Sequence, residues 1–113
     1  MPKRVDKLLI EDIVNAIEEI NQFVEDYTFE SFITDAKTKA AVIRNLEIIG
    51  EAASVVSTQT ISQYPLIEWK QMKQLRNKLI HEYFGIDYLI VWELLQDQIP
   101  YNYEYLKMIK FTD

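Results

Sequence analysis

The residues best able to carry chemistry lie in one short stretch, LRNKLIHEY, at positions 75–83. The stretch holds the only histidine of the chain, His81, five residues after Arg76. Histidine transfers protons near neutral pH, and the planar guanidinium of arginine matches the oxygen atoms of a phosphate. Asn77 and Tyr83 add two polar groups nearby. These residue types suit the cleavage of a phosphodiester without a metal ion.

On a helix, Arg76 falls on the apolar side of this stretch. At about 100° per residue, the surrounding apolar residues lie within roughly 100° on either side of Arg76. Asn77 and His81, four residues apart, form a neighbouring polar edge, whereas Tyr83 shares the face of Arg76. A charged group in an apolar arc is costly unless it has a partner. The apolar residues of the arc are Trp69, Met72, Leu75, Leu79 and Ile80.

Two interpretations fit this geometry. In the first, Arg76 pairs with an acidic residue of another helix, Glu47 or Glu51. His81 is then a cation at the C-terminus of its helix, where the helix dipole favours positive charge by about 0.3–1 kcal/mol. In the second, these groups converge on a phosphate of RNA, with His81 moving protons and Arg76 stabilising the transition state. One histidine cannot easily be both acid and base, but a twofold dimer would place two copies across one cleft.

Composition limits the other classes of function. The chain has 113 residues, of which 49% are hydrophobic and 27% charged, so we expect one globular domain over residues 1–113. It has no cysteine and a single histidine, which excludes disulfides, cysteine-ligated metals and multi-histidine zinc sites within one chain. We therefore expect no metal site and no cofactor. The net charge of −6 argues against a broad basic surface, so RNA would need a local patch or a partner.

The N-terminal segment lacks the long apolar core of a signal peptide. No run approaches the roughly 20 apolar residues that a membrane helix needs. Both observations predict a cytoplasmic protein with no membrane partner.

Helical periodicity predicts an all-α fold, an up-and-down bundle of four or five helices. Glycine (2) and proline (3) are scarce, and apolar residues recur at three- and four-residue spacing. The first helix is expected over about residues 5–26. An aromatic connector with one short helical turn follows over residues 27–35, where Phe29 and Phe32 are expected to cap the bundle.

The second helix is expected to begin after Thr34 or Asp35, either of which can serve as N-cap, and to end near Val56. Its apolar residues cover two sides, which is typical of a helix in the middle of a bundle or against a second protomer. Small residues would let another helix approach closely; these are Gly50, Ala52 and Ala53.

The polar stretch STQTISQY, residues 57–64, is expected to be a loop. Pro65 suits the first turn of a third helix, running from about Leu66 to Tyr83, because its missing N–H costs nothing there. Gly85 can end that helix in a left-handed C-cap.

A fourth helix is expected to follow Asp87 as N-cap, with Ile86 and Val91 forming a hydrophobic staple. Pro100 either starts a fifth helix or kinks the fourth. The amphipathic segment 101–111 completes the bundle.

The stretch also resembles the signature of a known family. Arg76, His81 and Tyr83 stand as Arg-x-x-x-x-His-x-Tyr, which resembles the signature of HEPN-domain ribonucleases. The segments AVIRNLEIIGEA, residues 41–52, and FGIDYLIVW, residues 84–92, resemble the HepT toxin branch specifically. The resemblance covers nearly the whole chain.

The resemblance implies a single HEPN domain that forms a homodimer, with the signatures of both protomers lining a shared cleft. It implies a metal-independent endoribonuclease, the toxin of a type VII toxin–antitoxin system, in which Arg76 and His81 are catalytic and Asn77 and Tyr83 position the RNA. The antitoxin would be a minimal nucleotidyltransferase that transfers AMP to Tyr83. The AMP group would add negative charge and bulk beside the phosphate site.

The segment 41–52 holds four candidates for supporting the cleft, although a structural role fits them equally well. These are Arg44, Asn45, Glu47 and Glu51. The alternative function is a non-catalytic HEPN interaction module, whose signature binds a nucleotidyltransferase partner or a nucleotide. Cleavage of RNA in the presence of EDTA separates the two functions.

Overall fold

The computed structural model describes the backbone of residues 2–80 and 85–111, and the side chains of residues 5–75, 77, 79 and 85–111. These residues form helices and no strand, which confirms the all-α prediction. The helices are α1 (Pro2–Phe23), α2 (Phe29–Ile33), α3 (Ala36–Ser54), α4 (Thr58–Gln63), α5 (Trp69–Ile80), α6 (Tyr88–Gln96) and α7 (Gln98–Leu106).

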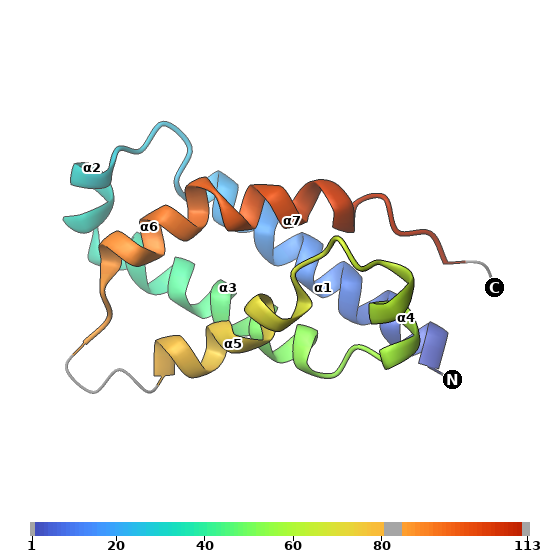
Figure 1. The fold of residues 1–113 in the computed structure, drawn as a ribbon. Helices are drawn as coiled ribbons and strands as arrows, with labels where there is room; N and C mark the ends of the chain where they lie inside the picture. Colours follow the sequence, from blue (N-terminus) through green and yellow to red (C-terminus); the bar gives the residue numbers. More distant parts are fainter. Residues whose placement is uncertain (1, 81–84, 112–113) are drawn as a thin grey trace.

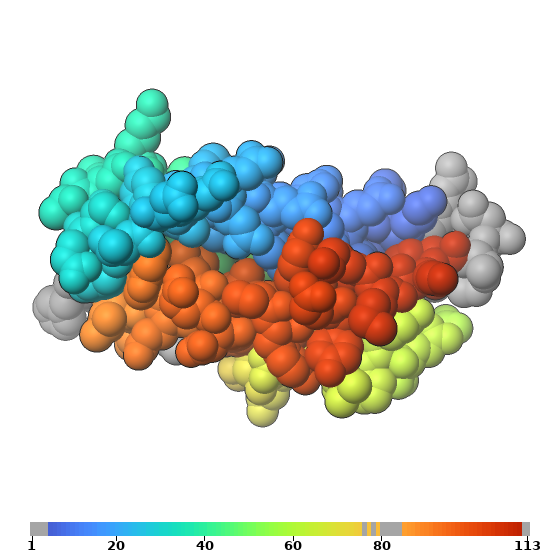
Figure 2. Space-filling view, turned by 90° about the horizontal axis from the view of Figure 1, so that it is seen from above, coloured from blue at the N-terminus to red at the C-terminus, as the bar shows by residue number. Residues whose placement is uncertain are grey.

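Three long helices set the arrangement (Figure 1). Helix α3 packs against α1 on one side and against α5 on the other, and α7 lies along α1. Figure 2 shows α6 and α7 running one after the other beside α1 along the length of the molecule. The molecule is elongated, with extents of 45 × 30 × 21 Å. Helix α1 begins and α7 ends at one end of the bundle, whereas α5 ends and α6 begins at the other (Figure 1).

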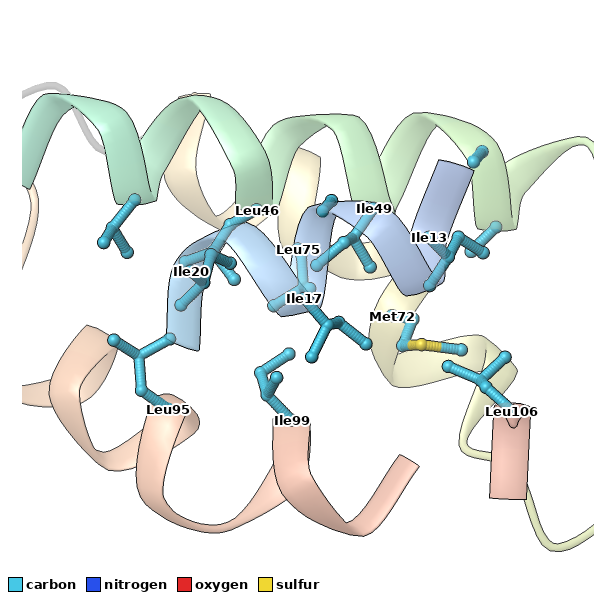
Figure 3. Packing of buried hydrophobic residues seen from close by; sticks show 14 of the residues in the cluster. Ile13, Ile17, Ile20, Leu46, Ile49, Met72, Leu75, Leu95, Ile99 and Leu106 are labelled. Atoms are coloured by element: carbon cyan, nitrogen blue, oxygen red, sulfur yellow. The ribbon is translucent and has the colours of Figure 1, made fainter. Parts of the chain in front are cut away.

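One hydrophobic core joins these helices (Figure 3). Its apolar residues recur every three or four positions, so each helix turns one stripe inward. Helix α3 buries two sides, including all three small residues predicted to allow close approach, which agrees with a place in the middle of the bundle. The buried side chains labelled in Figure 3 are Ile13, Ile17, Ile20, Leu46, Ile49, Met72, Leu75, Leu95, Ile99 and Leu106.

The first helix ends three residues earlier than predicted, at Phe23. Asp26 has a φ of 64°, a left-handed conformation that stops the helix and that aspartate adopts more readily than most residues. The predicted helical turn in the connector exists as α2, whose N-cap Thr28 forms a capping box with Ser31. Phe32, on this helix, is fully buried, as expected of a residue that caps the bundle.

Asp35 is the N-cap of α3, one of the two residues predicted for this role. Its side chain accepts a hydrogen bond from the Thr38 N–H at 3.0 Å and another from the Tyr27 hydroxyl at 2.6 Å. These hydrogen bonds, that of Tyr27 foremost, lower the pKa of Asp35 to about 2. The cap is therefore ionised at neutral pH, where it satisfies free N–H groups of the first turn.

The prediction of a loop over residues 57–64 was wrong, because residues 58–63 form α4. Ser57 is its N-cap, and Asp6 of α1 accepts hydrogen bonds from the Ser57 N–H at 3.0 Å and from the hydroxyls of Ser57 and Thr60. Asp6 is only 2% exposed. A distant carboxylate thus stabilises a helix whose polar sequence has no apolar period.

The third helix begins at Trp69 rather than at Leu66, so Pro65 lies in the turn before it and not in its first turn. The chain is held here by side chains: the Trp69 Nε1–H donates to the Tyr64 carbonyl at 2.9 Å. The predicted end at Tyr83 lies outside the described residues. Gly85 has a φ of 105°, the positive φ predicted for it, but the C-cap itself lies outside the described part.

The starts of the last two helices agree with prediction, but α7 ends at Leu106, before the end of the predicted amphipathic segment 101–111. Asp87 is the N-cap of α6 and accepts hydrogen bonds from the N–H groups of Leu89 and Ile90, at 3.0 and 3.3 Å. Helix α7 begins at Gln98, directly after α6, so Pro100 lies in the first turn of a separate helix. Its missing N–H costs nothing at that position.

Replacing Asp6 with alanine is expected to lower the free energy of unfolding by about 2–3 kcal/mol at pH 7, because buried donors lose their acceptor. Burial raises the pKa of Asp6, but the hydrogen bonds from Ser57 and Thr60 outweigh it and hold the pKa below its ordinary value of 3.8. The stabilisation is therefore complete above about pH 4 and is lost as the pH falls through the folded-state pKa.

Urea unfolding of both proteins at pH 7 and pH 3 tests this expectation, and the difference should be smaller at pH 3. Asp12→Ala, a change on the exposed face of the same helix, is the control and should shift stability by less than about 0.5 kcal/mol. A loss for Asp6→Ala no larger than that of the control would contradict the assigned role.

Candidate active site

The predicted catalytic stretch begins in α5 and runs beyond the part of the chain that the structure describes. Arg76 lies in α5, but its side chain is outside the described residues, as are His81 and Tyr83 entirely. Asn77 is described, and its side chain is exposed on α5. The distances among the four groups therefore stay predictions, and what the structure describes is how the stretch is held.

The apolar arc predicted around position 76 is confirmed for the four members whose side chains are described. Their exposed fractions are 6% for Trp69, 0% for Met72, 2% for Leu75 and 7% for Leu79. Position 76 follows Met72 by four residues and precedes Leu79 by three, so both neighbours one turn away belong to the core. Helix α5 is thus fixed on α3 up to the turn that carries the signature.

The start of α5 is locked to α7 by Asn102, whose side chain is fully buried. Its Oδ1 accepts a hydrogen bond from the Glu68 N–H at 2.8 Å, and its Nδ2 donates to the Glu68 carboxylate at 3.1 Å and to the Gln98 carbonyl at 2.9 Å. The Tyr101 hydroxyl adds a hydrogen bond to the Leu66 carbonyl at 2.9 Å. Asn102 therefore fixes both the position of α5 and the residue at which it begins.

The chain is anchored again just after the signature, at the start of α6. The Asp87 cap is followed by an aromatic cluster in which Phe32 contacts Trp92 and Tyr88, with ring centroids 5.2 and 6.2 Å apart. The ammonium group of Lys39 lies 4.6 Å from the centre of the Tyr88 ring. These contacts join α6 to α2 and α3. The signature therefore lies in the chain between two helices, α5 and α6, that both pack against the rest of the bundle.

The four residues of α3 that were predicted to support the cleft do not lie together around one site. Asn45 is buried and donates to the Ala16 carbonyl at 3.2 Å and to the Glu19 carboxylate at 3.0 Å, so it ties α3 to α1. Glu51 lines a hollow of about 250 Å³ between α3 and α1. Arg44 is exposed and Glu47 half-buried. The contacts of Asn45 favour its structural role; a pairing of Arg76 with either glutamate stays a prediction.

Charge is distributed unevenly over the helices. The sequence of α5 holds four basic residues and no acidic one, although the chain carries a net charge of −6. The exposed face of α1, by contrast, is rich in carboxylates. These are Glu11, Asp12, Glu18 and Glu19. Helix α5, in which the signature begins, is therefore a local basic region on an acidic protein.

Three hollows on the described surface are lined by other elements than α5. A groove of about 680 Å³ lies between α1 and the C-terminal segment, and a hollow of about 230 Å³ lies between the turn before α5 and the end of α7. Within the described ranges, no three histidine or carboxylate side chains gather as metal ligands, and no helix is both long and apolar enough to span a bilayer.

Comparison with known proteins decides the family. The model of the family described as "Ribonuclease HepT-like" matches residues 13–109. The chain belongs to the Ribonuclease HepT-like family. The matched region runs from the middle of α1 to beyond α7 and includes the whole signature.

The sequence of this HepT-like chain aligns with those of relatives named as ribonucleases over most of both chains. It is 44% identical to a Methanocaldococcus jannaschii protein named "Putative RNase" over 100 residues, 88% of this chain and 83% of the relative. It is 45% identical to the "Probable ribonuclease HepT" of Thermococcus cleftensis over 98 residues, 87% and 89% of the two chains. A second "Putative RNase" of M. jannaschii is 43% identical over 111 residues, 97% and 96%. No solved structure matches the chain.

Replacing Asn102 with alanine in the HepT-like chain is expected to cost about 2–3 kcal/mol, because buried polar groups at the start of α5 lose their partners. Amide exchange measured by mass spectrometry should also speed up in residues 66–72. Tyr101→Phe, which removes only the exposed hydroxyl contact to Leu66, is the matched control, with an expected cost of about 1 kcal/mol or less. Unchanged exchange in α5 of Asn102→Ala would show that Asn102 does not hold this helix.

Proposed function

We propose that this HepT-like chain is a metal-independent endoribonuclease and the toxin of a type VII toxin–antitoxin system, acting in the cytoplasm. The observation that carries the proposal is the family match over residues 13–109, which includes Arg76, His81 and Tyr83 in the spacing of the HEPN signature. The names of the relatives, which describe ribonucleases, support it. The basic composition of α5 supports a polyanionic substrate.

In the proposed reaction, the ribose 2′-oxygen attacks the adjacent phosphorus atom, and the bond from phosphorus to the 5′-oxygen of the next nucleotide breaks. One imidazole accepts the proton of the 2′-hydroxyl, and a second acid protonates the leaving 5′-oxygen. Arg76 stabilises the charge that gathers on the phosphate oxygens in the transition state. Asn77 and Tyr83 position the strand. The products are a 2′,3′-cyclic phosphate and a free 5′-hydroxyl.

A second copy of the chain would supply the second imidazole. The chain has one histidine, so an acid and a base of this type at one phosphate require His81 from two protomers. The exposure of Asn77 on α5 supports a site that faces outward, where a second protomer could complete it. The single HEPN domain, residues 1–113, would then form half of the active site.

Regulation would act on Tyr83. A minimal nucleotidyltransferase antitoxin would transfer AMP to its hydroxyl, which stands two residues from His81. The phosphate of AMP would place negative charge where the phosphate of RNA must bind. The rival function, a non-catalytic interaction module, is favoured by the net charge of −6, and the first experiment below separates the two.

Purified protein is expected to cleave single-stranded RNA in EDTA, and His81→Ala and Arg76→Ala are each expected to lower the rate by a factor of about 10²–10⁴. Lys110→Ala, an exposed change near the C-terminus, should leave the rate unchanged. Cleavage is measured with an end-labelled RNA on a denaturing gel. If the wild-type protein does not cleave, or if His81→Ala cleaves as fast as wild type, the nuclease proposal fails and the interaction module stands.

Tyr83→Phe keeps the aromatic ring and removes only the hydroxyl, so cleavage is expected to remain measurable, but the variant is expected to accept no AMP and to resist inhibition by the antitoxin. Intact-mass spectrometry after incubation with ATP and the cognate nucleotidyltransferase measures the modification. The control is Tyr101→Phe, which also removes one exposed hydroxyl and should be modified normally. Addition of AMP to Tyr83→Phe would place the modification on another residue.

A further inference from the structure

The solvent-facing side of α5 carries only basic and amide side chains. Every exposed residue whose side chain is described in this helix is a lysine, a glutamine or an asparagine. The residues are Lys70, Gln71, Lys73, Gln74 and Asn77. All five side chains can donate hydrogen bonds, and none brings negative charge.

Three of these residues form a continuous stripe. At about 100° per residue, Lys70, Lys73 and Asn77 fall within about 60° of one another on the helix. The stripe is about 10 Å long at 1.5 Å per residue, and it ends beside position 76. It therefore leads along the surface of α5 to the signature.

Lys70 stands at a position where the helix dipole disfavours positive charge. Lys70 is the second residue of α5, near the positive end of the helix dipole, where acidic residues are favoured. The first turn of α5 contains no acidic residue. Glu68, just before the helix, is hydrogen-bonded to Asn102. Positive charge at this position weakens the helix, so packing and capping do not explain it.

Neither lysine has an acidic partner within the part of the chain that the structure describes. Lys107, by comparison, pairs with Glu104 at 3.3 Å and lies over the Tyr103 ring. Lys70 and Lys73 both extend from a helix fixed at its start by Asn102 and along its length by α3. They present two ammonium groups that no carboxylate among the described side chains neutralises.

We propose that Lys70 and Lys73, with Asn77, bind the phosphates of the RNA strand next to the cleavage site and lead the strand to His81. This inference rests on the proposed function, whose substrate it locates on α5. The lysines act as positioning residues: they hold the strand through its backbone and so bind without preference for base. They also explain how an acidic protein binds a polyanion.

Binding is tested in the His81→Ala background, which separates affinity from cleavage. A fluorescein-labelled single-stranded RNA of mixed sequence is titrated by anisotropy over a range of salt concentrations. Adding Lys70→Gln and Lys73→Gln is expected to raise the Kd by about tenfold at low salt. The slope of log K against log salt is expected to shrink by about 1.4, because each lost phosphate contact contributes about 0.7 for a single strand.

Two matched variants serve as controls. Lys37→Gln with Lys110→Gln makes the same change of net charge at exposed positions elsewhere and should alter Kd by less than about twofold. Lys70→Arg with Lys73→Arg keeps the charges and should restore binding. With His81 intact, the double glutamine variant should raise KM more than it lowers kcat, because the lysines bind substrate and transition state alike.

The outcomes distinguish this inference from the proposed function. If the double glutamine variant binds RNA as tightly as the Lys37 and Lys110 control, or if His81→Ala binds no RNA, the inference is overturned. If wild type does not cleave RNA but the two lysines still govern binding, the nuclease proposal fails and the binding stripe stands. Equal loss in both charge-changed pairs would indicate attraction by net charge alone and would also overturn the inference.

Discussion

The packing of α3 between α1 and α5 is the contact on which the other parts of the molecule depend. Because α3 buries apolar residues on two sides, it orients both long neighbours at once. Asn45 fixes the register of the α1 side by hydrogen bonds to the Ala16 carbonyl and the Glu19 carboxylate. The orientation of the last turn of α5 thus depends on the packing of the core. A substitution of a buried residue in α3 is therefore expected to change the position of the signature.

The anchoring of the chain on both sides of the signature, and the basic residues of α5, make the proposed RNA site compatible with an acidic protein. Asn102 holds the start of α5, and Asp87 caps the helix that follows the signature. The exposed carboxylates of α1 stand on a different helix from α5. Interactions between exposed charges fall off over about 8 Å at physiological ionic strength. Local charge on α5 therefore matters more at close range than the net charge of −6.

The parts of the fold that depend on local patterns could be predicted from the sequence, and those that depend on distant hydrogen bonds could not. The caps Asp35 and Asp87 act within their own helix turns, so residue type and position sufficed. Helix α4 and the start of α5 depend instead on Asp6 and Asn102, whose partners are 51 and 34 residues away. No periodicity reveals such pairs.

The residues of the candidate site likewise fall into those that could be predicted from the sequence and those that could not. Arg76 and His81 were suggested by residue type and spacing, and the apolar arc around position 76 followed from helical geometry. The role of Asn102 was missed because an asparagine among tyrosines carries no sign of its burial. The proposed role of Lys70 and Lys73 was also not predicted, although one signal was present in the sequence: residues 69–80 contain no acidic side chain.

The dependence of α4 on Asp6 also sets an order of events in folding. A helix of six residues has too few hydrogen bonds to offset the cost of nucleation, so α4 cannot persist alone. Its stabilising carboxylate comes from the beginning of α1, which reaches it only after α1 and α3 have docked. Closing a loop of this length is slow relative to forming a single helix. We therefore expect α4 to form late in folding, after α1 and α3 have packed against each other.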